Sequence, residues 1–204
     1  MPREVTVVDA HLGNLDSVER AMIQVGASVV VTGDPDKVAA ARMVVFPGQG
    51  AFGAATNKVV NGALGAALKM VIGRGDPFLG ICVGMQLLFE DSEENGGNPG
   101  LGVLKGHVRR FPEGMTSFPG TRPLKIPHVG WNDVHPRGDH FYFSHSYYVD
   151  VADQSDVMWT TRYGTIEFPA AIAHQNIIGC QFHPEKSQWS GLRFLRSFIL
   201  GGRA

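Results

Sequence analysis

Cysteine is scarce in this sequence, and its scarcity narrows the class of protein. Only Cys82 and Cys180 occur in 204 residues. Secreted scaffolds held together by disulfides carry cysteine at a much higher density, so that class is excluded. The amino terminus, MPREVTVVDA, lacks the apolar core of a signal peptide. We therefore expect a soluble protein of the reducing cytoplasm.

Long apolar runs and an excess of one charge are also missing. No apolar stretch approaches the roughly 18 residues that a membrane-spanning helix needs. The formal net charge of −1 gives no sign of the basic surface that nucleic-acid binders carry. No histidine pair shows zinc-ligand spacing with the cysteines. We therefore expect no membrane, nucleic acid, metal or cofactor among the binding partners.

Short apolar runs alternate with helical patterns through the first half of the chain. The runs that predict buried strands are residues 4–9, 28–32, 43–46 and 77–82. The patterns that predict helices are residues 14–26, 34–41, a Gly/Ala-rich stretch to about residue 72, and 83–90. Alternation of this kind predicts a parallel sheet covered on both faces by helices.

The second half has a different character. Residues 91–100 are polar and predict a loop, and strand-like runs separated by turns follow without long helices. The clearest runs are 140–150, 156–163 and 176–182, and residues 188–200 predict a closing helix. We therefore predict one α/β domain over residues 1–204. Its central sheet is mostly parallel and flanked by helices, with an antiparallel extension in the second half.

The segment GQGAFG, residues 48–53, matches the G-x-G-x-x-G pattern of dinucleotide-binding loops. In that motif the acid that binds the ribose lies at the carboxyl end of the next strand. Asp76, the acid at about the right distance, comes before the next strand instead. We therefore disfavour a dinucleotide site. The same glycine-rich backbone could form an oxyanion hole, because its N–H groups can approach a ligand closely.

Cys82 lies between Gly80 and Gly84, where a strand pattern gives way to a helical pattern. The spacing G-x-C-x-G is the thiol counterpart of the nucleophile elbow, a sharp turn above the carboxyl edge of a sheet. The N-terminus of the following helix would favour the thiolate. Two interpretations stay open from these residues alone, a nucleophile or a buried cysteine beside packing glycines. Cys180 is expected as a buried strand residue.

A cysteine nucleophile needs a base, and the segment QFHPE, residues 181–185, contains a candidate. His183 follows an expected strand. In an extended chain Glu185, two residues on, would point to the same side. Pro184 restricts the backbone between them. Glu185 could then hold the tautomer of His183 and stabilise its imidazolium. The alternative is a solvated His-Pro-Glu turn.

Three segments together resemble the signature stretches of class I, or triad, glutamine amidotransferases. They are FPGQGAFG, GICVGMQLLF and QFHPEKS. The segments GNL, HVGWN, YFSHSYY and HPEKSQ are more specifically similar to the glutaminase subunits of imidazole glycerol phosphate synthase. GMQ after the cysteine, together with HVGWN, separates the chain from relatives that more often carry GHQ. The resemblance covers essentially the whole chain.

The resemblance implies a reaction and a set of residues. Cys82 attacks the side-chain amide of glutamine, His183 oriented by Glu185 transfers the proton and releases ammonia, and water hydrolyses the thioester. The further positions that it implies are oxyanion donors at Gly48, Gln49, Gly50 and Val83, substrate-binding residues at Gln86, His145 and Ser146, and partner-interface residues at Asn14, Trp131 and Lys186.

The resemblance also implies a partner. Ammonia would pass to a separate (β/α)8 cyclase/synthase subunit in a heterodimer. That subunit makes imidazole glycerol phosphate and aminoimidazole carboxamide ribotide in histidine biosynthesis. The sequence departs from the family pattern at Gln49, where valine is usual, at Val83, where leucine is usual, and at Ala10–His11, where Tyr-Gly is usual. These departures leave the three catalytic positions intact.

Two other functions fit part of this set of residues. A peptidase or γ-glutamyl hydrolase on the same elbow would explain Cys82 and His183, but not HVGWN. A non-catalytic binding module that kept the fold would not need an intact Cys82, His183 and Glu185.

Overall fold

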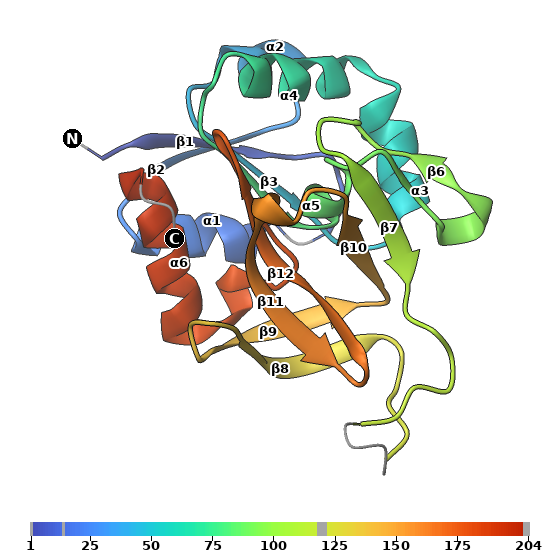
Figure 1. Ribbon diagram of the computed structural model, residues 1–204. Helices are drawn as coiled ribbons and strands as arrows, with labels where there is room; N and C mark the ends of the chain where they lie inside the picture. The colour runs from blue at the N-terminus through green and yellow to red at the C-terminus, as the bar shows by residue number, and fades with distance from the viewer. Residues whose placement is uncertain (1, 14, 118–121, 202–204) are drawn as a thin grey trace.

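The protein is described here by a computed structural model that covers residues 2–13, 15–117 and 122–201. A seven-stranded sheet forms its centre (Figure 1). Five neighbouring strands are parallel to one another. The two strands at one edge are joined through antiparallel pairing. In spatial order the strands are β11 (Val157–Tyr163), β12 (Ile166–His174), β13 (Ile177–Cys180), β4 (Phe78–Cys82), β3 (Val44–Gly48), β1 (Glu4–Val8) and β2 (Ser28–Thr32). The predicted fold class is confirmed.

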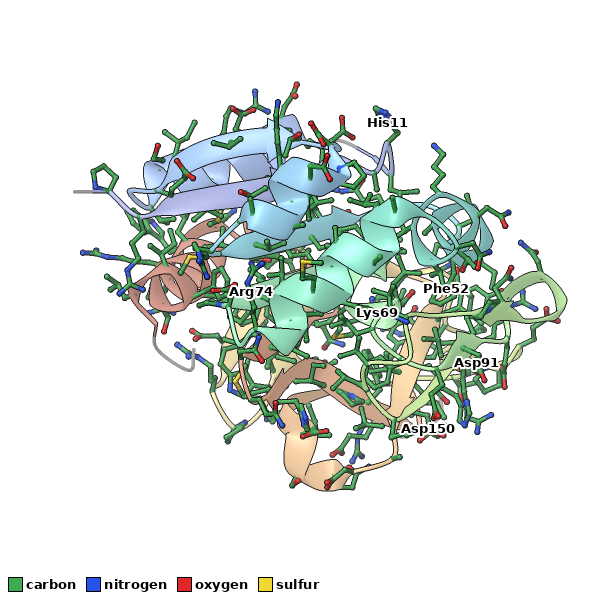
Figure 2. All side chains as sticks on the ribbon, turned by 90° about the horizontal axis from the view of Figure 1, so that it is seen from above. His11, Phe52, Lys69, Arg74, Asp91 and Asp150 are labelled. Carbon is green, nitrogen blue, oxygen red and sulfur yellow. The ribbon has the colours of Figure 1, made fainter. Side chains whose placement is uncertain are left out.

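Helices cover both faces of the sheet. On one face, α2 (Pro35–Ala40) packs beside α4 (Ala63–Gly73), and on the other α1 (Asp16–Gln24) contacts α6 (Gln188–Leu200) (Figure 1). Figure 2 shows Arg74 at the end of α4, where its guanidinium donates to the carbonyls of Ala39 and Ala41 at the carboxyl end of α2. No helix in the described part of the chain has the length and hydropathy that a membrane span requires.

Two smaller sheets extend the second half. One has the strand order β10 (Tyr147–Val151), β7 (Gly106–Arg110), β5 (Asp91–Ser92) and β6 (Asn98–Pro99), and the other pairs β8 (His128–Val134) with β9 (Asp139–His145). The expected strand 140–150 is therefore two strands in different sheets, divided at Ser146. The expected polar loop 91–100 is also wrong in part, since it contains β5, β6 and the 3₁₀ turn Glu94–Gly96.

Two expected helices differ from the prediction. The helix over 83–90 is only the single turn α5 (Val83–Gln86), because the carbonyls of Leu87 and Leu88 accept from the N–H groups of residues 101, 103 and 104 instead of continuing a helix. The Gly/Ala-rich helix is three pieces, α3 (Phe52–Ala55), a π-helical turn (Thr56–Val60) and α4.

The core lies on both sides of the central strands. Every residue of β3 and β4 is buried, as expected for inner strands of a sheet covered on two faces. Cys180 in β13 has no exposed surface, so its predicted place in a buried strand is confirmed. This packing fixes the carboxyl ends of β3, β4 and β13 next to one another.

Candidate active site

Strand register brings three segments that are far apart in sequence to one edge of the sheet. Gly48 at the end of β3 pairs with Cys82 at the end of β4. On the other side of β4, Cys180 pairs with Ile81. The QFHPE segment that continues β13 therefore passes directly beside the thiol. This is the carboxyl edge of a parallel sheet, where ligands bind in open α/β folds.

Cys82 has the backbone of a nucleophile elbow. Its φ of 54° and ψ of −110° lie in a region that side chains other than glycine rarely occupy. The flanking glycines are needed for space. A Cβ at Gly84 would lie 1.9 Å from the Phe46 carbonyl oxygen, and a Cβ at Gly80 would lie 2.8 Å from the Gly84 oxygen. The geometry therefore favours the elbow over packing alone as the reason for G-x-C-x-G.

His183 and Glu185 form a buried pair beside the thiol. His183 Nδ1 lies 2.9 Å from Glu185 Oε1, and both side chains are at most 2% exposed. The expected extended spacing is wrong, because Pro184–Lys186 form a 3₁₀ turn that brings the carboxylate back to the ring. Burial disfavours the charged imidazole. The charge and hydrogen bond of the Cys82 thiolate, with those of Glu185, outweigh it and hold the pKa of His183 above its ordinary value.

Ser187 fixes the position of the histidine. Its hydroxyl donates to the His183 carbonyl at 2.6 Å and accepts from the Tyr142 N–H at 2.9 Å. The His183 N–H also donates to the Tyr142 carbonyl at 2.8 Å. The backbone of the base is therefore tied to β9 by two hydrogen bonds, one direct and one through the Ser187 hydroxyl. Its ring is held in place before any ligand arrives.

A cavity of about 190 Å³ opens in front of the thiol. Pockets for drug-sized ligands measure roughly 300–1,000 Å³, so this cavity suits an amino acid better than a nucleotide. The predicted residues that line it are Gln49, Gly50, Cys82, Val83, Gln86, His145, Ser146, His183 and Lys186. Three further lining residues, Glu94, Ser144 and Tyr147, were missed from the sequence. Glu94 lies in the segment 91–100, for which the sequence predicts only a polar loop.

The predicted oxyanion loop is only partly available. The Gln49 N–H already donates to the Leu12 carbonyl at 2.8 Å. Val83 is the first residue of α5, so its N–H has no acceptor within the helix, and the residue lines the cavity. Gly48 does not line the cavity. A Cβ there would lie 2.9 Å from the Val83 side chain, so this glycine permits close approach of the two strand ends.

Gln86 is oriented by its neighbours. Its Nε2 donates to the Tyr147 carbonyl and to Gln181 Oε1, each at 2.9 Å. With both amide hydrogens used, Oε1 is the atom that can accept from a ligand in the cavity. Gln181 in turn donates to Cys82 Sγ at 3.5 Å, a contact that the sequence analysis did not anticipate.

The predicted interface residues have different positions. Trp131 lies on β8 with 48% of its surface exposed, and Lys186 lines the cavity. Asn14 lies outside the described residues. No group of three His, Cys, Asp or Glu side chains suited to a metal ion occurs among residues 2–13, 15–117 and 122–201.

Comparison with known proteins identifies close relatives. The family described as "Glutamine amidotransferase class-I" matches residues 6–200. The chain is 45% identical to "Imidazole glycerol phosphate synthase subunit HisH" of Salinibacter ruber, over 95% of this chain and 92% of that protein. It is 46% identical to the protein of the same name from Methylococcus capsulatus, over 96% of this chain and 95% of that protein.

Solved structures agree with the fold. A crystal structure of a glutamine amidotransferase superimposes with a TM-score of 0.74 at 18% identity, covering 97% of this chain and 98% of that one. PurLQS from Thermotoga maritima gives 0.71, also at 18% identity, covering 98% and 99%. With the sequence relatives, these findings confirm the resemblance seen in the motifs. The chain belongs to the class-I glutamine amidotransferase family, and within it to the HisH subunits of imidazole glycerol phosphate synthase.

Proposed function

We propose that this chain is a single amidotransferase domain over residues 1–204 that hydrolyses glutamine to glutamate and ammonia. Cys82 is the nucleophile, His183 the acid and base, and Glu185 the residue that orients His183. The observation that carries the proposal is the buried His183–Glu185 pair beside a strained Cys82, at the mouth of a cavity of amino-acid size.

The reaction follows from these three groups. The Cys82 thiolate attacks the side-chain carbonyl carbon of glutamine, and the carbonyl oxygen becomes an oxyanion. As the tetrahedral intermediate collapses, the C–N bond breaks, and the His183 imidazolium gives its proton to the nitrogen, which leaves as ammonia. His183 then removes a proton from water, which attacks the thioester. Glutamate leaves, and the thiolate is restored.

The cavity provides contacts for the amino-acid end of the substrate. Gln86 Oε1 and the Glu94 carboxylate are acceptors suited to an α-ammonium group, and both residues line the cavity. The main chain at His145 and Ser146 holds the same end of glutamine. This division leaves the side-chain amide of the substrate directed at the thiol.

The oxyanion needs two donors, and one of them needs a rearrangement. The Val83 N–H is already placed at the helix start. The Gln49 N–H must first leave the Leu12 carbonyl, to which it now donates at 2.8 Å. The loop through Gly48, Gln49 and Gly50 therefore supplies its donor only after a local turn of the backbone. Such a turn can make the reaction dependent on a second event.

The second event is docking of a partner. Relatives of this chain bear names that make them subunits of imidazole glycerol phosphate synthase, so a partner subunit is expected here. We propose that it is a (β/α)8 cyclase/synthase, in a cytoplasmic heterodimer of histidine biosynthesis. It would receive the ammonia and make imidazole glycerol phosphate and aminoimidazole carboxamide ribotide. Trp131 and Lys186 would face it, with Asn14.

Replacement of the nucleophile tests the proposal. Cys82→Ala should abolish glutamate release in the assembled enzyme, while product formation from external ammonium should persist because the synthase reaction needs only ammonia. Hydrolysis of glutamine at a rate comparable with wild type would overturn the assignment of Cys82. Faster hydrolysis of γ-glutamyl peptides than of glutamine by the wild type would favour the rival hydrolase.

A further inference from the structure

Gln181 contacts the Cys82 thiol but is not one of the three triad residues. β13 and β4 are parallel with Cys180 opposite Ile81, and Gln181, the residue that follows β13, therefore comes beside Cys82. Its Nε2 donates to Cys82 Sγ at 3.5 Å, an ordinary distance for a sulfur acceptor. The side chain has no exposed surface. A fully buried amide beside a strained cysteine is unusual enough to need an explanation.

The direction of this amide is fixed by its other contact. Gln86 Nε2 donates to Gln181 Oε1 at 2.9 Å. If the Gln181 amide were reversed, its NH₂ group would face the NH₂ group of Gln86, and both would lack an acceptor. The orientation of Gln86 therefore decides which end of Gln181 faces the thiol.

Gln86 is oriented by the Tyr147 carbonyl, which also accepts a hydrogen bond from His145. The Tyr147 carbonyl oxygen accepts from Gln86 Nε2 at 2.9 Å and from His145 Nδ1 at 2.8 Å. A carbonyl can only accept, so His145 carries its hydrogen on Nδ1. The other ring nitrogen of His145 must then accept whenever the ring is neutral.

A second buried histidine, His128, donates a hydrogen bond to that nitrogen. His128 Nδ1 lies 3.1 Å from His145 Nε2, and His128 Nε2 lies 3.4 Å from Asn132 Nδ2. Burial lowers the pKa of His145 to about 3, with the neighbouring His128 adding to the shift, and lowers that of His128 to about 4. Both rings are therefore neutral. Asn132 then donates to His128, His128 donates to His145, and His145 donates to the Tyr147 carbonyl.

The surroundings of the histidine pair would suit apolar side chains. His128 stacks on Tyr163 and Phe143, with ring centroids 4.1 and 4.9 Å away, and Phe111 and Phe168 complete the aromatic enclosure. Placing two polar rings here costs free energy unless their hydrogen bonds are satisfied, and in this pair they are. This chain of donors ends at the Tyr147 carbonyl, which Gln86 also contacts, so the histidine pair holds the carbonyl that anchors Gln86.

We propose that Gln181 is a further catalytic residue whose amide donates to the Cys82 thiolate, and that His128 and His145 are positioning residues. They hold in place the Tyr147 carbonyl to which Gln86, the partner of Gln181, donates. The proposal rests on the proposed function, in which Cys82 is the nucleophile. The donor holds the sulfur in line for attack, and it receives the thiolate again when water displaces it from the thioester.

Alkylation of Cys82 by iodoacetamide measures the thiolate without glutamine turnover. The titratable groups around the thiol are His183 with Glu185 behind it, Cys180 on the neighbouring strand, and the cavity residues Lys186, Glu94, His145 and Tyr147. All stay unchanged in the variants. Gln181→Met keeps the length of the side chain and removes the donor. We expect the midpoint of the pH–rate profile to move up by about one pH unit, because one hydrogen bond to a charged group is worth about that much.

The role of His128 is tested by a pair of variants that lose the same ring. His128→Asn keeps an N–H where Nδ1 stands, and His128→Leu has the same shape without it. His128→Leu should shift the midpoint in the same direction as Gln181→Met, by a smaller amount, and His128→Asn should keep the wild-type midpoint. Equal shifts in both variants would mean that only the lost volume matters, which would overturn the positioning role.

The outcomes separate this inference from the proposed function. Midpoints equal to wild type in Gln181→Met and His128→Leu would overturn the inference while leaving the Cys82→Ala result intact. A shift in Gln181→Met alone would keep the donor and overturn the histidine chain. The fully buried Cys180 becomes alkylated only if a variant unfolds. If Gln181→Met fails that control, the comparison of His128→Leu with His128→Asn decides the matter.

Discussion

At Cys82 the backbone and the side chain make opposite demands. The positive φ would suit glycine, and the chemistry requires a thiol. A strained residue of this kind costs roughly 1–3 kcal/mol and persists only where its surroundings hold it. Here the hydrogen bonds of β4 with β3 and β13 hold the strained backbone of Cys82. Part of the stability of the sheet therefore offsets this strain, which places the sulfur atom at the cavity.

Glu185 gives the sharpest prediction at the residue scale. Glu185→Gln keeps an oxygen near His183 Nδ1 and removes the negative charge, so the imidazolium loses its stabilisation. We expect kcat for glutamate release to fall by roughly tenfold or more, with a smaller change in KM. Steady-state kinetics in the presence of the partner measure both. The loss should stay below that of His183→Ala, and a variant as active as wild type would reduce Glu185 to a turn residue.

At the scale of elements, α6 acts as a clamp on the catalytic turn. A Cβ at Gly191 would lie 1.8 Å from the Pro184 carbonyl oxygen, so the helix touches the turn backbone to backbone. The distance from helix to turn therefore sets where His183 lies.

Two alanine substitutions in helices separate packing from helix propensity. Gly191→Ala should lower glutaminase activity and stability, because the new methyl pushes the Pro184 carbonyl away. Gly73→Ala at the end of α4 meets nothing within 4 Å, so it should raise stability, by up to about 1 kcal/mol. Urea unfolding and kcat/KM are the measurements. Equal gains in stability from both changes would contradict the clamp.

How far the sequence predicts this protein depends on the range of the interactions. Strands of the first half were predicted well because periodicity and turn residues are local. The early end of α5 was not predicted, because the Leu87 carbonyl accepts from the Leu101 N–H, and this pairing exists only in the folded chain. Cys82, His183 and Glu185 carry a local motif. Gln181 and Glu94 reach the site through strand pairing and loop packing, which no local pattern reveals.

At the scale of the whole molecule, buried histidines shape the pH dependence of stability. The folded pKa values of His128 and His145, about 4 and 3, lie below the ordinary 6.5 of the unfolded chain. Their contribution is therefore full above pH 6.5 and is lost as the pH falls toward those values. His183 has the opposite sign, because its raised pKa gives stability that is full below pH 6.5 and lost as the pH rises.

The free energy of unfolding should therefore be greatest near neutral pH. Between pH 6.5 and 5 each buried neutral histidine should contribute a slope of up to about 1.4 kcal/mol per pH unit. Urea unfolding at closely spaced pH values measures the slope. In His128→Asn one titrating group is gone, so the slope should be smaller by about that amount. An unchanged slope would show that His128 is not neutral in the folded protein.

The isolated chain should be a poor glutaminase, because the Gln49 N–H is held by Leu12. Addition of the synthase subunit with its nucleotide ligand should raise kcat strongly. Trp131→Ala and Lys186→Ala should weaken this stimulation, and Met70→Ala, an exposed apolar residue on α4, should not. Glutamate release with and without partner is the measurement. Full activity of the chain alone would contradict gating by the loop.

The pairing of β13 with β4 has a consequence for biosynthesis of the protein itself. A ribosome delivers Cys82 long before His183, because the chain emerges from its N-terminus. Until β13 is made and finds its place, the elbow has no base, no donor from Gln181 and no neighbour to hold its strain. Nascent and truncated chains should therefore release no ammonia. Acquisition of a reactive thiolate would mark the moment at which the last strand is inserted.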